Sequence, residues 1–145
     1  MARQSQALTL KASAAVTAPG TVTGDAAVLE EVFDEATFML DVTAAATDND
    51  DTLDVYIDAS PDGGTTWLNV AHFTQVLGNG GAKREVATVK ANPAATAPIA
   101  VAAAAAAGAV RPIGFFDRVR YRSVIVDPDE TDDVSFTFSV KAFFK

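Results

Sequence analysis

Apolar and polar residues alternate along four stretches of this 145-residue chain. In the clearest stretch, Leu53, Val55 and Ile57 share one face, while Asp54 and Asp58 lie on the other. Successive side chains of a β-strand point to opposite faces of the sheet, so a period of two predicts a strand with one buried and one solvated face. The four stretches are residues 7–16, 36–44, 53–59 and 134–144.

Turn-forming sequences separate these stretches: APGT, TDNDD, SPDGG, GNGG and DPDETDD. Asp and Asn bond to their own backbone in turns, and Gly supplies positive φ angles. No long amphipathic helix lies between them, and a sheet with one apolar face needs a second sheet to cover it. The sequence therefore predicts an all-β fold, an antiparallel β-sandwich of jelly-roll type.

The exception is the alanine-rich insert at about 91–112, ANPAATAPIAVAAAAAAGAVRP. Alanine favours helix, but residues 98–108 are too short and featureless for a helix that is stable without tertiary contacts. We expect either a short helix or ordered loop between strands, or an arm that contacts a partner. The predicted organisation is a flexible N-terminal arm, residues 1–6, and one sandwich domain, residues 7–145.

The composition excludes several classes of function. The net charge of −8 disfavours binding to nucleic acid or to an anionic membrane, both of which require basic side chains. The chain has no cysteine, which excludes disulfides, thiolate metal sites and a cysteine nucleophile. No stretch has the length of a membrane span or resembles a signal peptide. We expect a soluble protein that is assembled in the cytoplasm.

The segment SPDGGTTW resembles an Asp-box, a short hairpin element. The matching positions are Ser60, Asp62, Gly64, Thr66 and Trp67. The resemblance implies that the carboxylate and hydroxyl groups bond the turn backbone and that the aromatic ring packs below it, anchoring the next strand. A single copy predicts a structural turn away from any active site. The tryptophan is also expected to contribute to the core.

Two acidic loops have some features of calcium sites. Asp48, Asp50 and Thr52 have the spacing of the first three EF-hand ligands, but Leu53 stands where that loop requires glycine. The segment 127–133 is acidic without a ligand pattern. Solvated turns are the expected structure of both, and calcium binding by either stays open.

Nothing in the sequence predicts catalysis. His72 is the only histidine, and no nucleophile or orienting acid accompanies it in a recognisable motif. We expect it to be a packed or surface residue. No glycine-rich phosphate loop joins a strand to a helix. The sequence therefore predicts no enzyme activity, no cofactor and no metal.

Three arginines fall on one face of a strand in the segment DRVRYRSVIV. Arg118, Arg120 and Arg122 lie at period two in an otherwise acidic chain, so they need carboxylate partners. The partners are either internal, from Asp54 and Asp58 on a neighbouring strand, or they belong to another subunit. The arginines are accordingly a possible subunit interface.

The segments SPDGGTTW, AHFTQV, RVRYRSVIV and SFTFSVKAFF together resemble small β-rich structural proteins of tailed bacteriophages, in particular head decoration (cement) proteins. The resemblance implies a non-enzymatic jelly-roll or sandwich protein, often trimeric. It further implies binding to the major capsid protein on the outside of the capsid, in a virion assembled in the host cytoplasm. It assigns no residue roles, and the alanine-rich insert departs from it.

Two other functions remain as alternatives. The same fold would serve a phage tail or neck component. A carbohydrate-binding β-sandwich is the alternative from another class, with Trp67, Tyr56 or Tyr121 stacking on a sugar. Few aromatic residues lie outside the core positions, which disfavours that alternative.

Overall fold

The structure is a computed structural model that describes residues 6–90, 104–111, 116–130 and 134–145. Within these ranges the chain forms ten β-strands and no helix. The strands are β1 (Gln6–Val16), β2 (Gly20–Thr23), β3 (Ala27–Val28), β4 (Glu35–Ala44), β5 (Thr52–Ser60), β6 (Leu68–His72), β7 (Val76–Leu77), β8 (Lys83–Lys90), β9 (Arg118–Val126) and β10 (Phe136–Phe144). The predicted all-β fold is confirmed.

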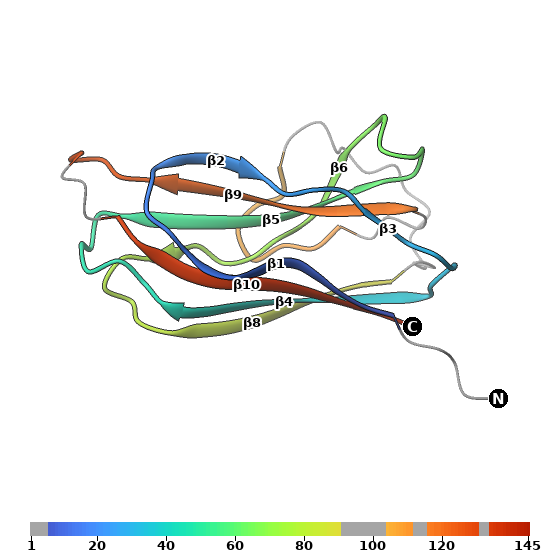
Figure 1. The fold of residues 1–145 in the computed structure, drawn as a ribbon, viewed down its shortest axis with the longest axis horizontal. Coiled ribbons are helices and arrows are strands. Elements are labelled where there is room, and N and C mark those ends of the chain that lie inside the picture. The colour runs from blue at the N-terminus through green and yellow to red at the C-terminus, as the bar shows by residue number, and fades with distance from the viewer. Residues whose placement is uncertain (1–5, 91–103, 112–115, 131–133) are drawn as a thin grey trace.

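Two antiparallel sheets lie face to face (Figure 1). One has the order β1-β10-β4-β8 and the other β2-β9-β5-β6, with β3 beside β9 and β7 beside β5. The pairings are nested: β1 pairs with β10, β2 with β9, β4 with β8 and β5 with β6. A long hairpin rolled up on itself gives this order, which is that of a jelly roll.

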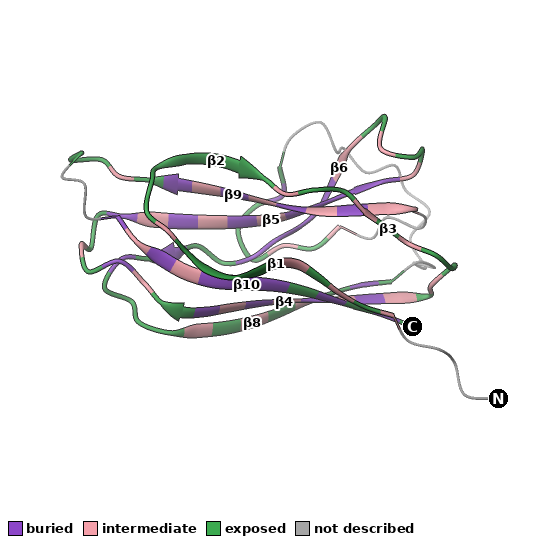
Figure 2. Ribbon diagram, in the orientation of Figure 1, coloured by how far each residue is buried: buried purple, intermediate pink, exposed green. Residues whose placement is uncertain are grey.

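The core fills the space between the two sheets, where the buried residues of facing strands meet (Figure 2). The apolar faces predicted for β4, β5 and β10 are the buried ones. Their fully buried side chains include Phe38, Leu40, Val42, Leu53, Val55, Ile57, Phe136, Phe138 and Val140. Strand β9, which pairs with β5, adds Val119, Tyr121 and Ile125.

The even alternation expected for residues 7–16 does not hold in β1. Its pairing with β10 shifts register between Thr9 and Lys11 and again between Lys11 and Ala14. The first shift places Lys11 opposite Val140, a core position. Leu8 and Leu10 pack against the core as predicted, but Ala12 and Ala14 are exposed. An extra residue in one strand moves later side chains to the other face, and sequence alternation alone does not report it.

Residues 104–111 run beside β6. The backbone of Val110 pairs with that of Ala71, and the His72 amide donates to the Ala109 carbonyl at 3.0 Å. This described part of the insert is not helical. Residues 91–103 and 112 of the insert, and residues 1–5 of the predicted arm, lie outside the described residues. No helix in the described ranges is long and apolar enough to cross a membrane.

Candidate functional site

The turn that joins β5 to β6 is closed by its own side chains. Asp62 accepts hydrogen bonds at its Oδ1 atom from the Ser60 hydroxyl (2.8 Å) and from the Thr66 amide (2.7 Å). The Gly64 amide donates to Ser60 Oγ at 2.9 Å. Gly63 and Gly64 have φ angles of 73° and 94°, which favour glycine. The carboxylate of Asp62 and the hydroxyl oxygen of Ser60 thus both accept hydrogen bonds from within the turn.

The same turn is attached to the start of β9. The Gly63 amide donates to Asp117 Oδ1 at 3.1 Å, and the Asp117 amide donates to the Ser60 carbonyl at 2.8 Å. The hydrogen bond from the Thr66 amide, with further bonds from Thr66 and Ser60, holds the pKa of Asp62 below its usual value. The ionised form of this carboxyl group is therefore the one that the turn requires.

Trp67 lies on the outer face of the sheet and not in the core. The guanidinium carbon of Arg120 is 3.9 Å from the centre of the indole ring, a cation–π contact. The expectation that the tryptophan contributes to the core is wrong, because the strand that it precedes turns the ring toward the charged face of β9. The ring packs on the guanidinium group of Arg120 instead.

The three arginines of β9 lie on that outer face, with internal carboxylates beside them. Arg122 Nε is 3.0 Å from Asp58 Oδ2, and Arg120 Nε is 3.9 Å from the same oxygen. Arg118 contacts the Asp117 carboxylate at 3.9 Å. The Asp58 side chain is 7% exposed, so this pairing is largely shielded from water.

Asp54, a predicted alternative partner of the arginines, binds His72 and Gln75 instead. Its Oδ1 atom is 2.8 Å from His72 Nε2, and its Oδ2 atom accepts a hydrogen bond from Gln75 Nε2 at 2.8 Å. The His72 ring stacks on Tyr56 with centroids 4.0 Å apart, and the Arg122 guanidinium lies 4.2 Å from the centre of the same tyrosine ring. Burial, followed by the charge of Asp54, raises the pKa of Tyr56.

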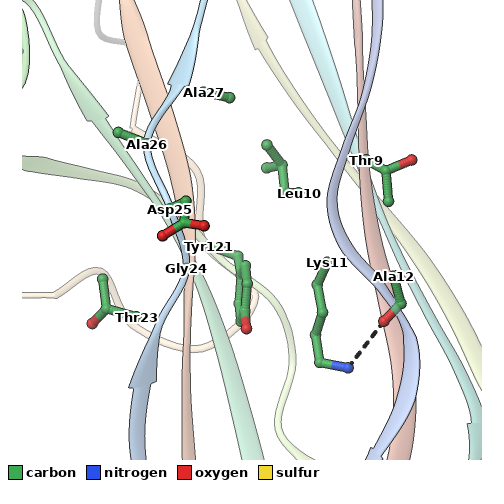
Figure 3. A pocket seen from close by; sticks show the side chains of 10 residues that line it. All are labelled: Thr9, Leu10, Lys11, Ala12, Thr23, Gly24, Asp25, Ala26, Ala27 and Tyr121. Carbon is green, nitrogen blue, oxygen red and sulfur yellow. Dashed lines mark hydrogen bonds between the residues drawn. The ribbon is translucent and has the colours of Figure 1, made fainter.

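A groove of about 510 Å³ opens between the edges of the two sheets (Figure 3). Strand β1 forms one wall and the connection from β2 to β3 forms the other, with Tyr121 at the base. The Lys11 amine donates to the carbonyls of Phe138 (2.9 Å), Ala14 (3.1 Å) and Ala12 (3.2 Å), and it lies 4.1 Å from the Phe138 ring centre. Burial lowers the pKa of Lys11.

Tyr121 faces the groove from the inner side of β9. Burial, and to a lesser degree the charge of Asp25, raises the pKa of this tyrosine. Its hydroxyl group therefore stays protonated across the neutral range. The amine of Lys11 is already engaged by three backbone carbonyls.

The acidic loop at residues 48–51 forms a local turn, in which Asp48 Oδ1 accepts a hydrogen bond from the Asp50 amide at 2.9 Å. Thr52 is the first residue of β5. In the part of the chain that the structure describes, no three His, Cys, Asp or Glu side chains are grouped as metal ligands. Residues 131–133 of the second acidic loop lie outside that part.

Sequence reasoning missed two clusters, the one around His72 and the one around Lys11. The pattern of β5 already placed Asp54 and Tyr56 on one face, and the hairpin turn predicted a following strand, but the sequence did not show that His72 of that strand pairs with Tyr56. The Lys11 cluster depends on a register shift that leaves no mark in the alternation. Both clusters arise from pairing between strands, which the local pattern does not encode.

No family model matches the chain, and no curated protein matches it. Among solved structures, the chain is similar to a chain in the "Structure of infectious bursal disease virus Gx strain". The TM-score is 0.51 at 13% sequence identity, over 97% of this chain and 31% of the viral chain. At this identity the likeness shows the fold alone. The protein is a jelly-roll β-sandwich that corresponds to about a third of the length of a chain from a virus structure.

Proposed function

We propose that this chain is a non-enzymatic structural protein of a virion, and specifically a head decoration protein that binds the outside of a phage capsid. The observation that carries the proposal is the jelly roll itself, which uses nearly the whole chain and is shared over 97% of it with a chain from a virus structure. The resemblance of four segments to phage decoration proteins narrows this class. Its partner would be the major capsid protein, and a trimer is the favoured oligomer.

The outer face of the β2-β9-β5-β6 sheet supports a structural role over a catalytic one. Both ring nitrogens of His72 are bound by Asp54 and the Ala105 carbonyl, so the ring has no nitrogen left for a substrate. The carboxylate of Asp58 is engaged by Arg122 and Asn69. The described contacts of His72 and Asp58 are therefore made within the protein.

A tail or neck component is the closest alternative, since the same fold would serve it. A sugar-binding module is less well supported by the aromatic rings. The ring of Tyr56 contacts both His72 and Arg122, and the guanidinium group of Arg120 lies over the ring of Trp67. Tyr121 is buried in the core. A sugar-stacking platform requires an open ring face, which Tyr121 lacks and which the other two rings offer only in part.

Sedimentation of a lysate from cells that assemble the particle tests the proposal. A virion protein is expected in the capsid-sized fraction, and it should remain there after washing in moderate salt. Recovery of the entire chain in the slowly sedimenting soluble fraction would contradict a virion role. Binding of the pure chain to a glycan array would then support the sugar-binding alternative.

A further inference from the structure

Residues 104–111, which we call the 104–111 segment, lie against β6 and are bonded by the imidazole ring of His72. His72 is 8% exposed and is the only histidine of the chain. Its Nε2 atom is 2.8 Å from Asp54 Oδ1, and its Nδ1 atom is 2.8 Å from the carbonyl oxygen of Ala105. One side chain thus joins β5 to the 104–111 segment through two short contacts.

The protonation state of the ring follows from what its partners can do. A backbone carbonyl only accepts hydrogen bonds, so Nδ1 must carry a proton to bond Ala105. The Asp54 carboxylate accepts a second hydrogen bond from Gln75 Nε2 at its other oxygen, and an ionised carboxylate has no proton of its own to donate. Nε2 must therefore also carry a proton. A neutral imidazole has only one N–H group. Its other nitrogen would be an acceptor that faces the carbonyl oxygen of Ala105 or the carboxylate oxygen of Asp54, which are also acceptors.

We infer that His72 is bound as the imidazolium ion and that its second proton is a pH-sensitive latch for the 104–111 segment. The inference goes beyond the proposed virion role and does not depend on it. The latch is closed while both ring nitrogens are protonated. It opens when rising pH removes one proton, because one of the two acceptors then loses its donor.

Backbone amides of the 104–111 segment also bond to β6, so they respond when the segment moves. The Ala105 amide donates to Asn69 Oδ1 at 2.8 Å, the Gly108 amide donates to the His72 carbonyl at 2.8 Å, and the Arg111 amide donates to the Val70 carbonyl at 2.8 Å. These three amides report directly on whether the segment is docked. Other contacts also hold the segment, because Ala105 is 6% exposed and the His72 amide donates to the Ala109 carbonyl at 3.0 Å. Loss of one ring contact is therefore expected to loosen the segment and not to detach it.

The charged groups around the ring come from each element packed near it. On β5, Asp54 is in contact and Asp58 lies beyond Tyr56, whose ring stacks on the imidazole at 4.0 Å. From β9, Arg122 lies over the same tyrosine at 4.2 Å and is paired with Asp58.

Three further charged residues lie close in the chain or the fold. Lys83 and Glu85 of β8 form an ion pair beside Thr74, two residues after the histidine. Arg111 lies at the end of the 104–111 segment. Among these neighbours, Asp54 is the charged group in hydrogen-bond contact with the ring.

The test is an NMR titration from about pH 5 to about pH 9, which spans the range in which histidine ordinarily changes charge. Imidazole nitrogen shifts of the single histidine report the proton on each ring nitrogen. Hydrogen exchange at the amides of Ala105, Gly108 and Arg111 is measured relative to core amides of β4. Both nitrogens are expected to be protonated at the low end. As the ring loses a proton, relative exchange of the three amides should rise roughly tenfold, the effect of losing one charge-assisted hydrogen bond.

Two variants sharpen the result. His72→Gln cannot change its charge, so the three amides should exchange faster and without the pH step. Asp41→Asn removes a carboxylate from the other sheet, where it pairs with Arg84, and should leave the titration unchanged. An unprotonated ring nitrogen at about pH 5 would overturn the inference. So would relative exchange that stays constant while the wild-type ring titrates, and both readings remain available if His72→Gln does not fold.

Discussion

The backbone at Gly24 lies against the ring of Tyr121, and the contact leaves no room for a side chain. A Cβ atom at this position would be 2.3 Å from Tyr121 Cε1, well inside van der Waals contact. The Gly24 amide also donates to the Tyr121 carbonyl at 3.0 Å, which fixes the connection between β2 and β3 on β9. The glycine is therefore required by close approach, and this connection forms one wall of the groove.

Replacing Gly24 with alanine should destabilise the protein by about 1–3 kcal/mol, because the added methyl group forces the ring or the loop to move. Urea denaturation of the variant and the wild type measures the change. Adding the substitution to a Tyr121→Ala background removes the clash, so it should cost clearly less there. An equal cost in both backgrounds would contradict the contact.

Asp62 should give the folded state a dependence on acid pH. Its folded pKa lies below the usual value for aspartate, about 3.9, because Thr66 and Ser60 bond the ionised form. The stabilisation is therefore fully present above that pH and is lost as pH falls through the folded pKa. The effect is expected to be small, since the carboxylate is exposed to water.

Asp62→Asn keeps the shape of the side chain and removes its titration. The melting temperature of this variant should approach that of the wild type as pH falls from about 6 to about 2, while the wild type is the more stable at the upper end. Thermal denaturation followed by circular dichroism measures both. A constant difference across this range would show that the carboxylate charge has no part in closing the turn.

At the scale of elements, the pairing of β5 with β9 determines which charges meet. Their register sets Asp58 opposite Arg120 and Tyr56 opposite Arg122, so one carboxylate lies between two arginines. Asn69 of β6 donates to the same carboxylate at 3.1 Å. Two arginines of the predicted face are therefore paired with Asp58 inside the protein. The proposed subunit interface would use the parts of the arginine side chains that this pairing leaves exposed.

Asp58→Ala should destabilise the protein by about 3 kcal/mol, since it leaves largely buried arginine charges without their partner. The matched control is Asp41→Ala in the pairing of β4 with β8, where Asp41 faces an Arg84 that is 66% exposed. The control should cost less than about 1 kcal/mol. Guanidinium denaturation measures both, and equal costs would contradict the difference in burial.

The elements differ in how far the sequence predicts them. Strands β4, β5 and β10 form where apolar and polar residues alternate, because each strand has one face on the core and one face toward water. Strand β1 alternates as evenly, yet its register shifts turn Lys11 toward Phe138. The shift depends on pairing with β10 and on three carbonyls that accept from the amine, and neither is local in sequence.

At the scale of the whole molecule, nested pairing makes the two ends of the described chain neighbours. Gln6 of β1 pairs with Phe144 of β10, and β10 lies in the centre of its sheet between β1 and β4 (Figure 1). The sandwich is therefore complete only when the last strand enters it. Alternation and turn sequences predicted a sandwich of jelly-roll type, but the order of its strands comes from contacts far apart in sequence.

The candidate site was less predictable than the fold. The arginines and the turn residues were visible as local patterns, and their roles in assembly remain proposals. Trp67, His72 and Asp54 meet their partners only after β6 pairs with β5 and the 104–111 segment pairs with β6. No pattern within either segment specifies those neighbours.

The most direct test of the proposed function is the number of copies of this chain in purified virus particles, measured by quantitative mass spectrometry against the major capsid subunit. A head decoration protein should be present in many copies and in a fixed ratio to that subunit. A few copies per particle would instead indicate the tail or neck alternative. Absence of the chain from purified particles would contradict a virion structural role.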